Sequence, residues 1–219
     1  MTSRTYGEAC GMAHALDLVG ERWAMLVVRE LLLGPKRFSD LDAGLAGASP
    51  NVLSERLRQL EQVGVVRRRR MGPPARAWVY ELTEWGRELE PIMLALGTWG
   101  VRSPLLDGSG HVSVDSIVLA LRTYFTTDAT DWDATYEVRF DDDRFAVRVT
   151  GGAISVERGS AADPDATIAT DARTFRDLLG NGPLLGELAG GAVTLTGDGA
   201  VAERLFAAVQ VPGAVPAPA

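Results

Sequence analysis

The chain has little cysteine and histidine, and it has no long uninterrupted hydrophobic run. Cys10 is the only cysteine among 219 residues, so no internal disulfide can form, which is typical of proteins in a reducing cytoplasm. No run of ~18 apolar residues that could cross a membrane is present. Residues 1–11 lack the charged and then apolar pattern of a secretory signal. These absences predict a cytoplasmic protein without membrane contact.

The sequence also lacks the side-chain clusters that metal binding and catalysis require. The two histidines, His14 and His111, have no neighbours at metal-ligand spacing. The acidic triplet at residues 141–143 lacks the ligand spacing and the terminal glutamate of a calcium loop. Nucleophile motifs, paired catalytic acids and phosphate-binding glycine loops are missing as well. We therefore expect no metal, no cofactor and no enzymatic activity.

The net charge is −7, but charge is distributed unevenly along the chain. Residues 1–104 hold 14 basic and 12 acidic residues, whereas residues 105–219 hold 8 basic and 17 acidic residues. Seven of the basic residues lie between Arg56 and Arg76. A basic segment of this kind is typical of a nucleic-acid-binding element, and the acidic part of the chain is repelled by DNA. We therefore expect DNA binding in the first part of the chain.

Residues 39–82 predict a helix followed directly by a basic hairpin. Ser49-Pro50 is a typical helix start, because serine caps free N–H groups and proline fits the first helical turn. Gly64 ends this helix. Four arginines, residues 67–70, then lead through Gly72-Pro73-Pro74 into an aromatic strand. A helix and an adjacent hairpin in this order predict a winged helix-turn-helix, in which the helix enters the major groove of DNA and the hairpin contacts the backbone.

The helix after Ser49 has one apolar and one polar side. At 100° per residue, the core-facing side holds Val52, Leu53, Leu57, Leu60 and Val63. Arg56 falls on that same side, so its head group is expected to reach a phosphate or an acidic partner. The outward side carries Asn51, which suits adenine, and Arg58, which suits guanine. In the hairpin, strand alternation directs only half of the arginines to one side. The candidate DNA-contacting residues are Ser49, Asn51, Ser54, Arg56, Arg58, Arg68, Arg69, Arg70 and Arg76.

Apolar spacing predicts three helices before this segment and one after it. They cover about residues 8–18, residues 22–33, a short helix that opens at residues 37–41, and residues 84–99. Ser39 is the expected cap of the short helix. Pro91 is expected to kink the last helix or to mark a restart, because proline lacks the N–H group that continues a helix.

The second half of the chain alternates short strands with helices. The predicted strands are residues 135–140, 145–150, 153–157, 166–170 and 193–196, and the predicted helices are residues 114–125, 171–179 and 200–209. This pattern is typical of an α+β fold. We therefore predict an α+β protein with a winged helix-turn-helix domain for DNA binding and dimerisation at 1–104, an α+β domain at 105–211 and a disordered tail at 212–219.

The motifs of residues 6–101 occur together in one family. They are Cys10, Leu16 to Trp23, Gly34-Pro35, Arg37 to Leu41, Leu53 to Leu57, Gly64-Val65-Val66, Tyr80 to Thr83 and Trp99-Gly100. In this combination the segment resembles the HxlR-type winged-helix regulators, which are relatives of the MarR group. The resemblance implies a homodimer whose N- and C-terminal helices form the interface, and a repressor of genes with a palindromic double-stranded DNA operator. Glycine follows Cys10 here, where many relatives have proline.

Three segments of the second half form a further pattern. They are Asp165 to Ile168, Phe175 to Leu179 and Val193 to Asp198. They resemble a sterol-carrier-type lipid-binding domain, from about residue 114 to residue 211. The resemblance implies an apolar cavity between a sheet and helices, and an apolar small molecule as its ligand. The candidate pocket residues are Trp132, Tyr136, Phe140, Phe175, Leu179 and Phe206, with ordinary core packing as the alternative for each.

Two other interpretations of function stay open beside a ligand-controlled DNA-binding repressor. In the first, Cys10 senses oxidants or electrophiles, as a cysteine at this position often does in the family, which requires an exposed thiol with a lowered pKa. The alternative for Cys10 is a small apolar residue buried in the first helix, the commoner use of a free cysteine. In the second interpretation, the protein carries a lipid or small molecule and uses its winged helix only to dimerise.

Overall fold

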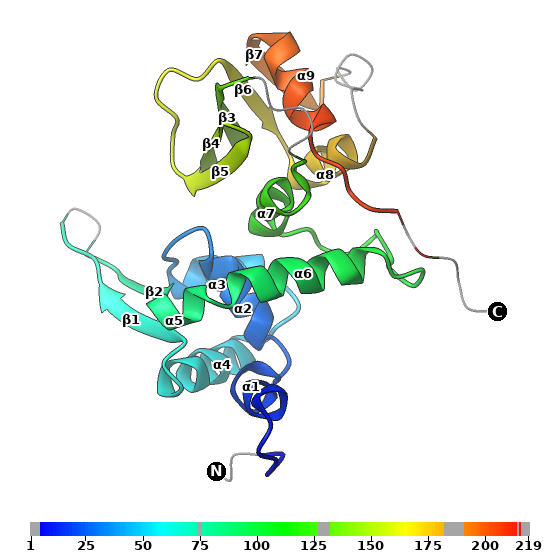
Figure 1. Ribbon diagram of the computed structural model, residues 1–219. Coiled ribbons are helices and arrows are strands. Elements are labelled where there is room, and N and C mark those ends of the chain that lie inside the picture. Colours follow the sequence, from blue (N-terminus) through cyan, green and yellow to red (C-terminus); the bar gives the residue numbers. More distant parts are fainter. Residues whose placement is uncertain (1–4, 74–75, 127–131, 182–190, 214, 216–219) are drawn as a thin grey trace. The chain divides into compact units, whose positions relative to one another are not determined.

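The computed structural model describes residues 5–73, 76–126, 132–181, 191–213 and 215 of the chain (Figure 1). The chain forms two compact units, Met1–Met93 and Leu94–Ala219. The division falls within one helix, α6 (Glu90–Val101). The sequence suggested a boundary at residue 104 instead, and the predicted domain ranges stay a prediction. Within the described residues, no helix is both long enough and apolar enough to cross a membrane.

The first unit contains five helices, a two-stranded sheet and the start of α6 in its described part. The elements are α1 (Gly11–Val19), α2 (Ala24–Leu31), α3 (Phe38–Gly44), α4 (Pro50–Gln62), β1 (Val66–Arg70), β2 (Trp78–Leu82) and α5 (Glu84–Arg87). This order matches the predicted helices and hairpin. The break between α5 and α6 confirms a restart at Pro91, because α6 begins one residue before that proline and needs no N–H group from it.

The core of the first unit lies where α2, α3 and α4 meet. Its buried side chains include Val27 and Val28 of α2, Leu41 of α3, and Leu53 and Leu57 of α4. The predicted core-facing side of α4 is therefore confirmed at its centre. Val52 is an exception, because 38% of its surface is exposed. It lies at the edge of the apolar side, farther from the centre than Arg56, which explains why the valine is exposed and the arginine is buried.

The start of α3 differs from the prediction. Ser39 lies inside the helix, and Arg37 occupies the cap position. The backbone N–H of Arg37 donates a hydrogen bond to the Asp40 carboxylate at 3.0 Å. The expectation that Ser39 caps this helix was wrong, because Asp40 stands at the third helical position, from which a carboxylate can reach back to the cap residue.

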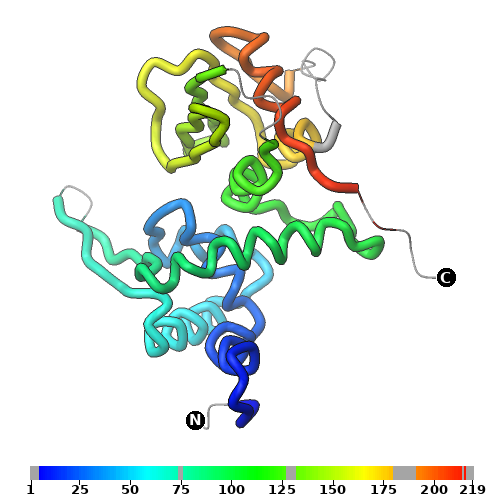
Figure 2. The backbone as a smooth tube through the Cα atoms, in the orientation of Figure 1, coloured from blue at the N-terminus to red at the C-terminus, as the bar shows by residue number. Residues whose placement is uncertain are grey.

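The hairpin β1–β2 projects away from the helices of its own unit (Figure 2). Its strands pair antiparallel, with Arg68 opposite Tyr80 and Arg70 opposite Trp78. The predicted tip includes Pro74, which lies outside the described residues. In the middle of β2, Tyr80 also pairs with Lys36 through two backbone hydrogen bonds of 2.8 and 3.0 Å. The segment before α3 therefore acts as a third, very short strand that fastens the hairpin to the helices.

The second unit is an α+β fold, as predicted. Its elements, after the last part of α6, are α7 (Val114–Tyr124), β3 (Ala134–Phe140), β4 (Asp143–Thr150), β5 (Ala153–Arg158), β6 (Ala166–Thr170), α8 (Ala172–Asn181), β7 (Val193–Gly197) and α9 (Gly199–Ala207). The five strands lie in the order β5-β4-β3-β6-β7, and only the β3–β6 pair is parallel. Helices α7, α8 and α9 gather on one side of this sheet (Figure 1). Most of the predicted tail at 212–219 lies outside the described residues.

Candidate nucleic-acid interface

Helix α4 presents a polar stripe to solvent along its whole length. Asn51, Ser54 and Arg58 are exposed and recur at helical spacing, as predicted. Ser49 caps the helix, because its Oγ accepts a hydrogen bond from the backbone N–H of Val52 at 3.4 Å. Ser49 therefore has a structural task in addition to its predicted place near DNA. An exposed stripe of these residue types has the donors and acceptors that base edges and phosphates require.

The head group of Arg58 is held by a neighbour on the same helix. Its Nε and Nη2 donate to the two carboxylate oxygens of Glu55 at 2.9 and 2.6 Å. Gln59 donates to the same carboxylate at 2.7 Å. The hydrogen bonds from Arg58 are the main reason that the pKa of Glu55 lies below its ordinary value. A contact between Arg58 and a base therefore requires the guanidinium to leave this carboxylate or to share it.

Arg56 is buried, with 9% of its surface exposed. Its guanidinium donates to the Gln59 side-chain carbonyl, and it forms an ion pair with Glu21 at 3.6 Å. Of the two partners predicted for Arg56, a phosphate or an acidic residue, the structure supplies the acidic one. The Nε atom of Arg56 is buried without a hydrogen-bond partner among the described residues.

The four arginines of β1 divide between the two faces of the hairpin, as strand alternation predicted. Arg67 and Arg69 share one face with Glu81, which is only 5% exposed. Their Nε atoms donate to the two oxygens of that carboxylate, each at 2.7 Å. Burial opposes ionisation of Glu81, but the hydrogen bonds from Arg69 and Arg67 outweigh it and hold its pKa below the ordinary value. One carboxylate therefore compensates one of the two positive charges on this face.

Arg68 and Arg70 occupy the opposite face of the hairpin. The guanidinium of Arg68 lies over the rings of Trp78 and Tyr80, with 4.7 and 5.8 Å to the ring centroids. Trp78 is 51% exposed. Arg70 is exposed, and so is Arg76, whose backbone adopts a positive φ of 40°. No side-chain partner for Arg70 or Arg76 is found in the part of the chain that the structure describes. The positive charges of these two arginines are therefore accessible to a phosphate.

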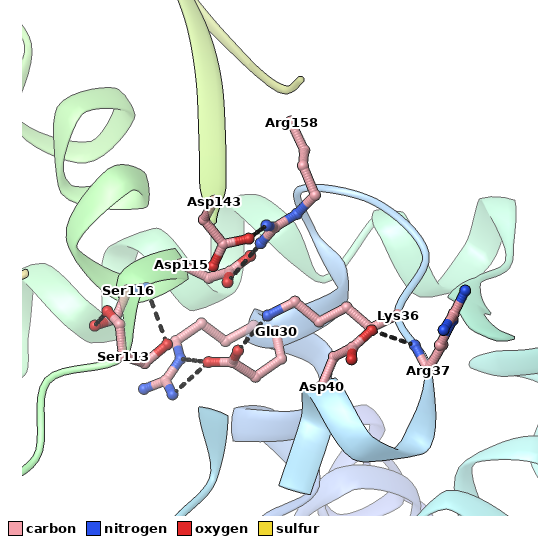
Figure 3. Close-up of polar contacts among 10 residues, drawn as sticks. Glu30, Lys36, Arg37, Asp40, Ser113, Asp115, Ser116, Asp143 and Arg158 are labelled. Atoms are coloured by element: carbon pink, nitrogen blue, oxygen red, sulfur yellow. Dashed lines mark hydrogen bonds and ion pairs between the residues drawn. The ribbon is translucent and has the colours of Figure 1, made fainter. Parts of the chain in front are cut away.

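A buried ion pair supports the attachment of the hairpin to the helices. Lys36 points toward Glu30 of α2 (Figure 3), and its Nζ lies 2.6 Å from Oε2 of that carboxylate. Arg29 donates to the other oxygen at 2.8 Å. The side chain of Glu30 is fully buried. Because Lys36 also pairs with Tyr80 through its backbone, this ion pair fixes the point at which the hairpin joins the helices.

Cys10 lies at the cap position of α1 and is exposed. The backbone N–H groups of Ala13 and Met12, in the first turn of the helix, lower the pKa of its thiol. The alternative of a buried apolar cysteine was therefore wrong. The residue stands just before the first helical turn rather than within it, and this position leaves its side chain in solvent.

The candidate pocket residues of the second unit lie largely in its core. Tyr136, Phe140, Phe175 and Phe206 are buried. The ring of Phe175 packs edge-on against Phe140 and Phe206, each at 5.3 Å. Trp132 is half-buried, and its indole N–H donates to the Tyr136 hydroxyl at 3.0 Å. As a set of ligand-binding residues they stay a prediction. Leu179 also lines an open cavity of about 410 Å³ formed with residues of α7 and α8.

An ion-paired arginine supports the sheet of the second unit. Arg158 of β5 reaches Asp115 of α7 and Asp143 of β4 (Figure 3), and its Nη2 donates to both Asp115 oxygens at 2.7 and 2.8 Å. This cluster has a structural task. In the described part of the chain, no group of three histidine, cysteine, aspartate or glutamate side chains is placed to hold a metal ion.

Four residues that shape the interface were not among those predicted from the sequence. They are Glu55 and Gln59 on α4, and Trp78 and Glu81 on β2. Glu55 stands three residues before Arg58, a spacing at which helix side chains meet. That spacing was a usable signal. Glu81 lies directly across from Arg67, but no sequence rule gave the register of the two strands.

The first part of this chain is similar to known proteins. A family model described as HxlR-like helix-turn-helix matches residues 18–104. The HTH-type transcriptional regulator YvaP of Bacillus subtilis is 41% identical over 85 residues, which is 39% of this chain and 79% of YvaP. The HTH-type transcriptional regulator sll1512 of Synechocystis is 37% identical over 94 residues, 43% of this chain and 70% of the relative. Among solved structures, the redox regulator HypR in its oxidized form shares 33% identity over 42% of this chain and 94% of that chain, with a TM-score of 0.39.

Proposed function

The chain belongs to the HxlR-like helix-turn-helix family, whose members are transcriptional regulators and not enzymes, and on that premise we propose that it represses transcription in the cytoplasm as a homodimer bound to a palindromic operator. One observation carries the proposal: the exposed stripe of Asn51, Ser54 and Arg58 belongs to the same unit as an arginine-rich hairpin. The helix supplies contacts to base edges, and the hairpin supplies contacts to phosphates.

Exposed apolar side chains support the homodimer. Met12 and Leu16 of α1 are exposed, as are Ile92, Leu96 and Trp99 of α6. An apolar groove of about 220 Å³ runs between α1 and the segment Trp85–Ile92. Side chains of this kind gain free energy when a second copy covers them, and each subunit then presents its own α4 to one half-site. Native mass spectrometry measures the assembly directly.

Two arginine substitutions separate base contact from phosphate contact. Arg58→Ala is expected to lower the preference for the operator over a scrambled duplex about tenfold, because a base-reading guanidinium is lost. Arg70→Ala is expected to weaken both duplexes equally and to flatten the slope of log K against log salt by ~0.9, because one phosphate contact is lost. Fluorescence anisotropy titrations at several salt concentrations measure both quantities.

Arg148→Ala is the matched control for these titrations. This arginine lies on β4 of the acidic second unit and pairs with Glu157 at 3.3 Å, so its loss should change neither quantity. Equal effects of Arg58→Ala and Arg70→Ala on both duplexes would contradict the division of roles. If the purified wild-type protein fails to bind promoter fragments at low ionic strength, the proposed function itself is wrong.

The position of Cys10 favours a second candidate function, control by thiol oxidation. Its thiol is exposed and its pKa is lowered, which are the two properties that a reactive cysteine needs. Diamide oxidises two thiols to a disulfide, and because each chain has one cysteine, the second thiol has to come from another subunit. Diamide is expected to release wild-type protein from its operator and to leave Cys10→Ser bound. Release of both proteins, or of neither, would contradict this role.

We also propose that the second unit senses an apolar small molecule. The open cavity of about 410 Å³ supports this, because five apolar side chains line it together with four polar or charged ones that could orient a ligand. The apolar residues are Val101, Ile117, Ala120, Leu179 and Val211, and the polar ones are Ser116, Tyr124, Arg176 and Asp177. A ligand changes DNA affinity only if it binds one arrangement of the dimer better than another. The native mass spectra that give the assembly also reveal any additional mass retained after mild extraction.

A further inference from the structure

Glu81 stands at the base of the hairpin with almost no access to solvent. Only 7% of its side chain is exposed, whereas the side chains of its partners Arg67 and Arg69 are 62% and 43% exposed. Each oxygen of the carboxylate accepts one Nε hydrogen bond of 2.7 Å. The carboxylate therefore ties down both arginines of one hairpin face, and both oxygens already have a charged donor.

This arrangement changes the number of charges that the hairpin offers to DNA. Four arginines on one short strand would give the wing a charge of +4, but the buried carboxylate reduces the face of Arg67 and Arg69 to a net +1. On the other face, Arg68 is stacked on Trp78 and Tyr80 and keeps its full charge, as does Arg70. The positive charge of the wing is thus concentrated on one of its two faces.

We propose that Glu81 is a specificity-determining residue, which holds Arg67 and Arg69 away from phosphates so that the wing contacts DNA through the face of Arg68 and Arg70. The inference rests on the proposed function. Affinity for DNA of any sequence rises with each additional phosphate that a protein neutralises. Base contacts from α4 are unaffected by such additional charges. A carboxylate that withdraws charge from the wing therefore lowers binding to unrelated DNA and raises the ratio of operator to unrelated affinity.

Glu81→Gln tests the inference, because glutamine keeps the shape and a carbonyl acceptor but removes the negative charge. The variant is expected to steepen the salt slope for scrambled DNA by ~0.9 and to raise affinity for that DNA about tenfold near 0.1 M salt. The preference for the operator falls accordingly. Anisotropy titrations of the full-length protein against operator and scrambled duplexes measure both quantities, and circular dichroism verifies the fold.

A second variant keeps the inference testable if Glu81→Gln fails to fold. In a protein that keeps Glu81, replacing both Arg67 and Arg69 with glutamine should leave the slope of log K against log salt at its wild-type value. Neither arginine contacts DNA while Glu81 holds it. Where Glu81→Gln does fold, adding Arg69→Gln to it should return the slope to its wild-type value.

Three outcomes would overturn the role of Glu81. They are an unchanged slope in Glu81→Gln, weaker binding of scrambled DNA by that variant, and a flattened slope in the Arg67→Gln/Arg69→Gln protein. Each of these leaves operator binding by the wild type intact and so leaves the proposed function standing. Absence of any wild-type binding at low salt removes the proposed function and this inference together.

Discussion

Gly86→Ala is expected to lower the free energy of unfolding of the first unit by about 3 kcal/mol, because a methyl group at this position overlaps backbone atoms. The added Cβ would lie 2.1 Å from the carbonyl oxygen of Val65 and 3.1 Å from its carbonyl carbon. Backbone cannot move aside as the end of a flexible side chain can. Gly86 also donates its N–H to the Thr83 hydroxyl at 3.0 Å, and that hydroxyl donates to the Gly64 carbonyl at 2.7 Å. The overlap therefore disturbs the junction between β1 and α5.

Urea unfolding followed by circular dichroism measures this change, with Gly97→Ala as the control. Gly97 is an exposed residue in the interior of α6, where a Cβ meets nothing within 4 Å. There alanine should be neutral or stabilising by up to about 1 kcal/mol, because alanine has the higher helix propensity. Similar midpoints for the two variants would show that the chain at Gly86 relaxes freely, contrary to the geometry.

Lys36→Met is expected to cost about 3–5 kcal/mol of stability, because it removes one partner of a buried ion pair. Glu30 is fully buried, and its carboxylate lies closer to the ammonium of Lys36, at 2.6 Å, than to the guanidinium of Arg29, at 2.8 Å. Gly44 adds to the constraint, since a Cβ there would lie 2.5 Å from Oε2 of Glu30. The carboxylate therefore has little room to turn toward water when the ammonium is lost.

The double variant Glu30→Met/Lys36→Met supplies the control for this prediction. Replacing both members of a buried pair by apolar residues of similar volume is often close to neutral, so the double variant should recover most of the loss. Hydrogen exchange of the Tyr80 amide, which donates to the Lys36 carbonyl, is expected to accelerate in the single variant. A double variant as unstable as Lys36→Met would indicate that the charges matter less than the shapes of the two side chains.

Helices and strands that depend only on residues close together in the chain could be predicted from the sequence. Ser49, Pro50 and Gly64 marked the ends of α4, and alternation along β1 correctly separated its arginines into two faces. The family of the first part followed from motifs that are close together in the chain. Local rules also gave the strands of the second unit, because each is a short apolar run between turn residues.

Features that depend on contacts between distant residues were not predictable in the same way. The pairing of Arg69 with Glu81 depends on strand register, and the burial of Arg56 depends on Glu21, which lies in the turn after α1. Ser39 was misassigned because the helix already begins at Phe38, where the Asp40 carboxylate accepts a hydrogen bond from the backbone N–H of Arg37. The aromatic residues of the second unit could be identified as apolar, but whether such residues fill a core or surround a ligand depends on how three helices meet the sheet.

The strand-like contact between Lys36 and Tyr80 has a consequence for regulation. Because β2 pairs both with β1 and with the segment that leads into α3, helix α4 and the hairpin are expected to move as one stiff body. A ligand that deformed this body would have to break the buried ion pair between Lys36 and Glu30 and the backbone pairing of Lys36 with Tyr80, which costs free energy. In the proposed homodimer, the quantity left to adjust is the distance between the two copies of α4, and a distance that no longer matches the helical repeat of DNA would release the operator.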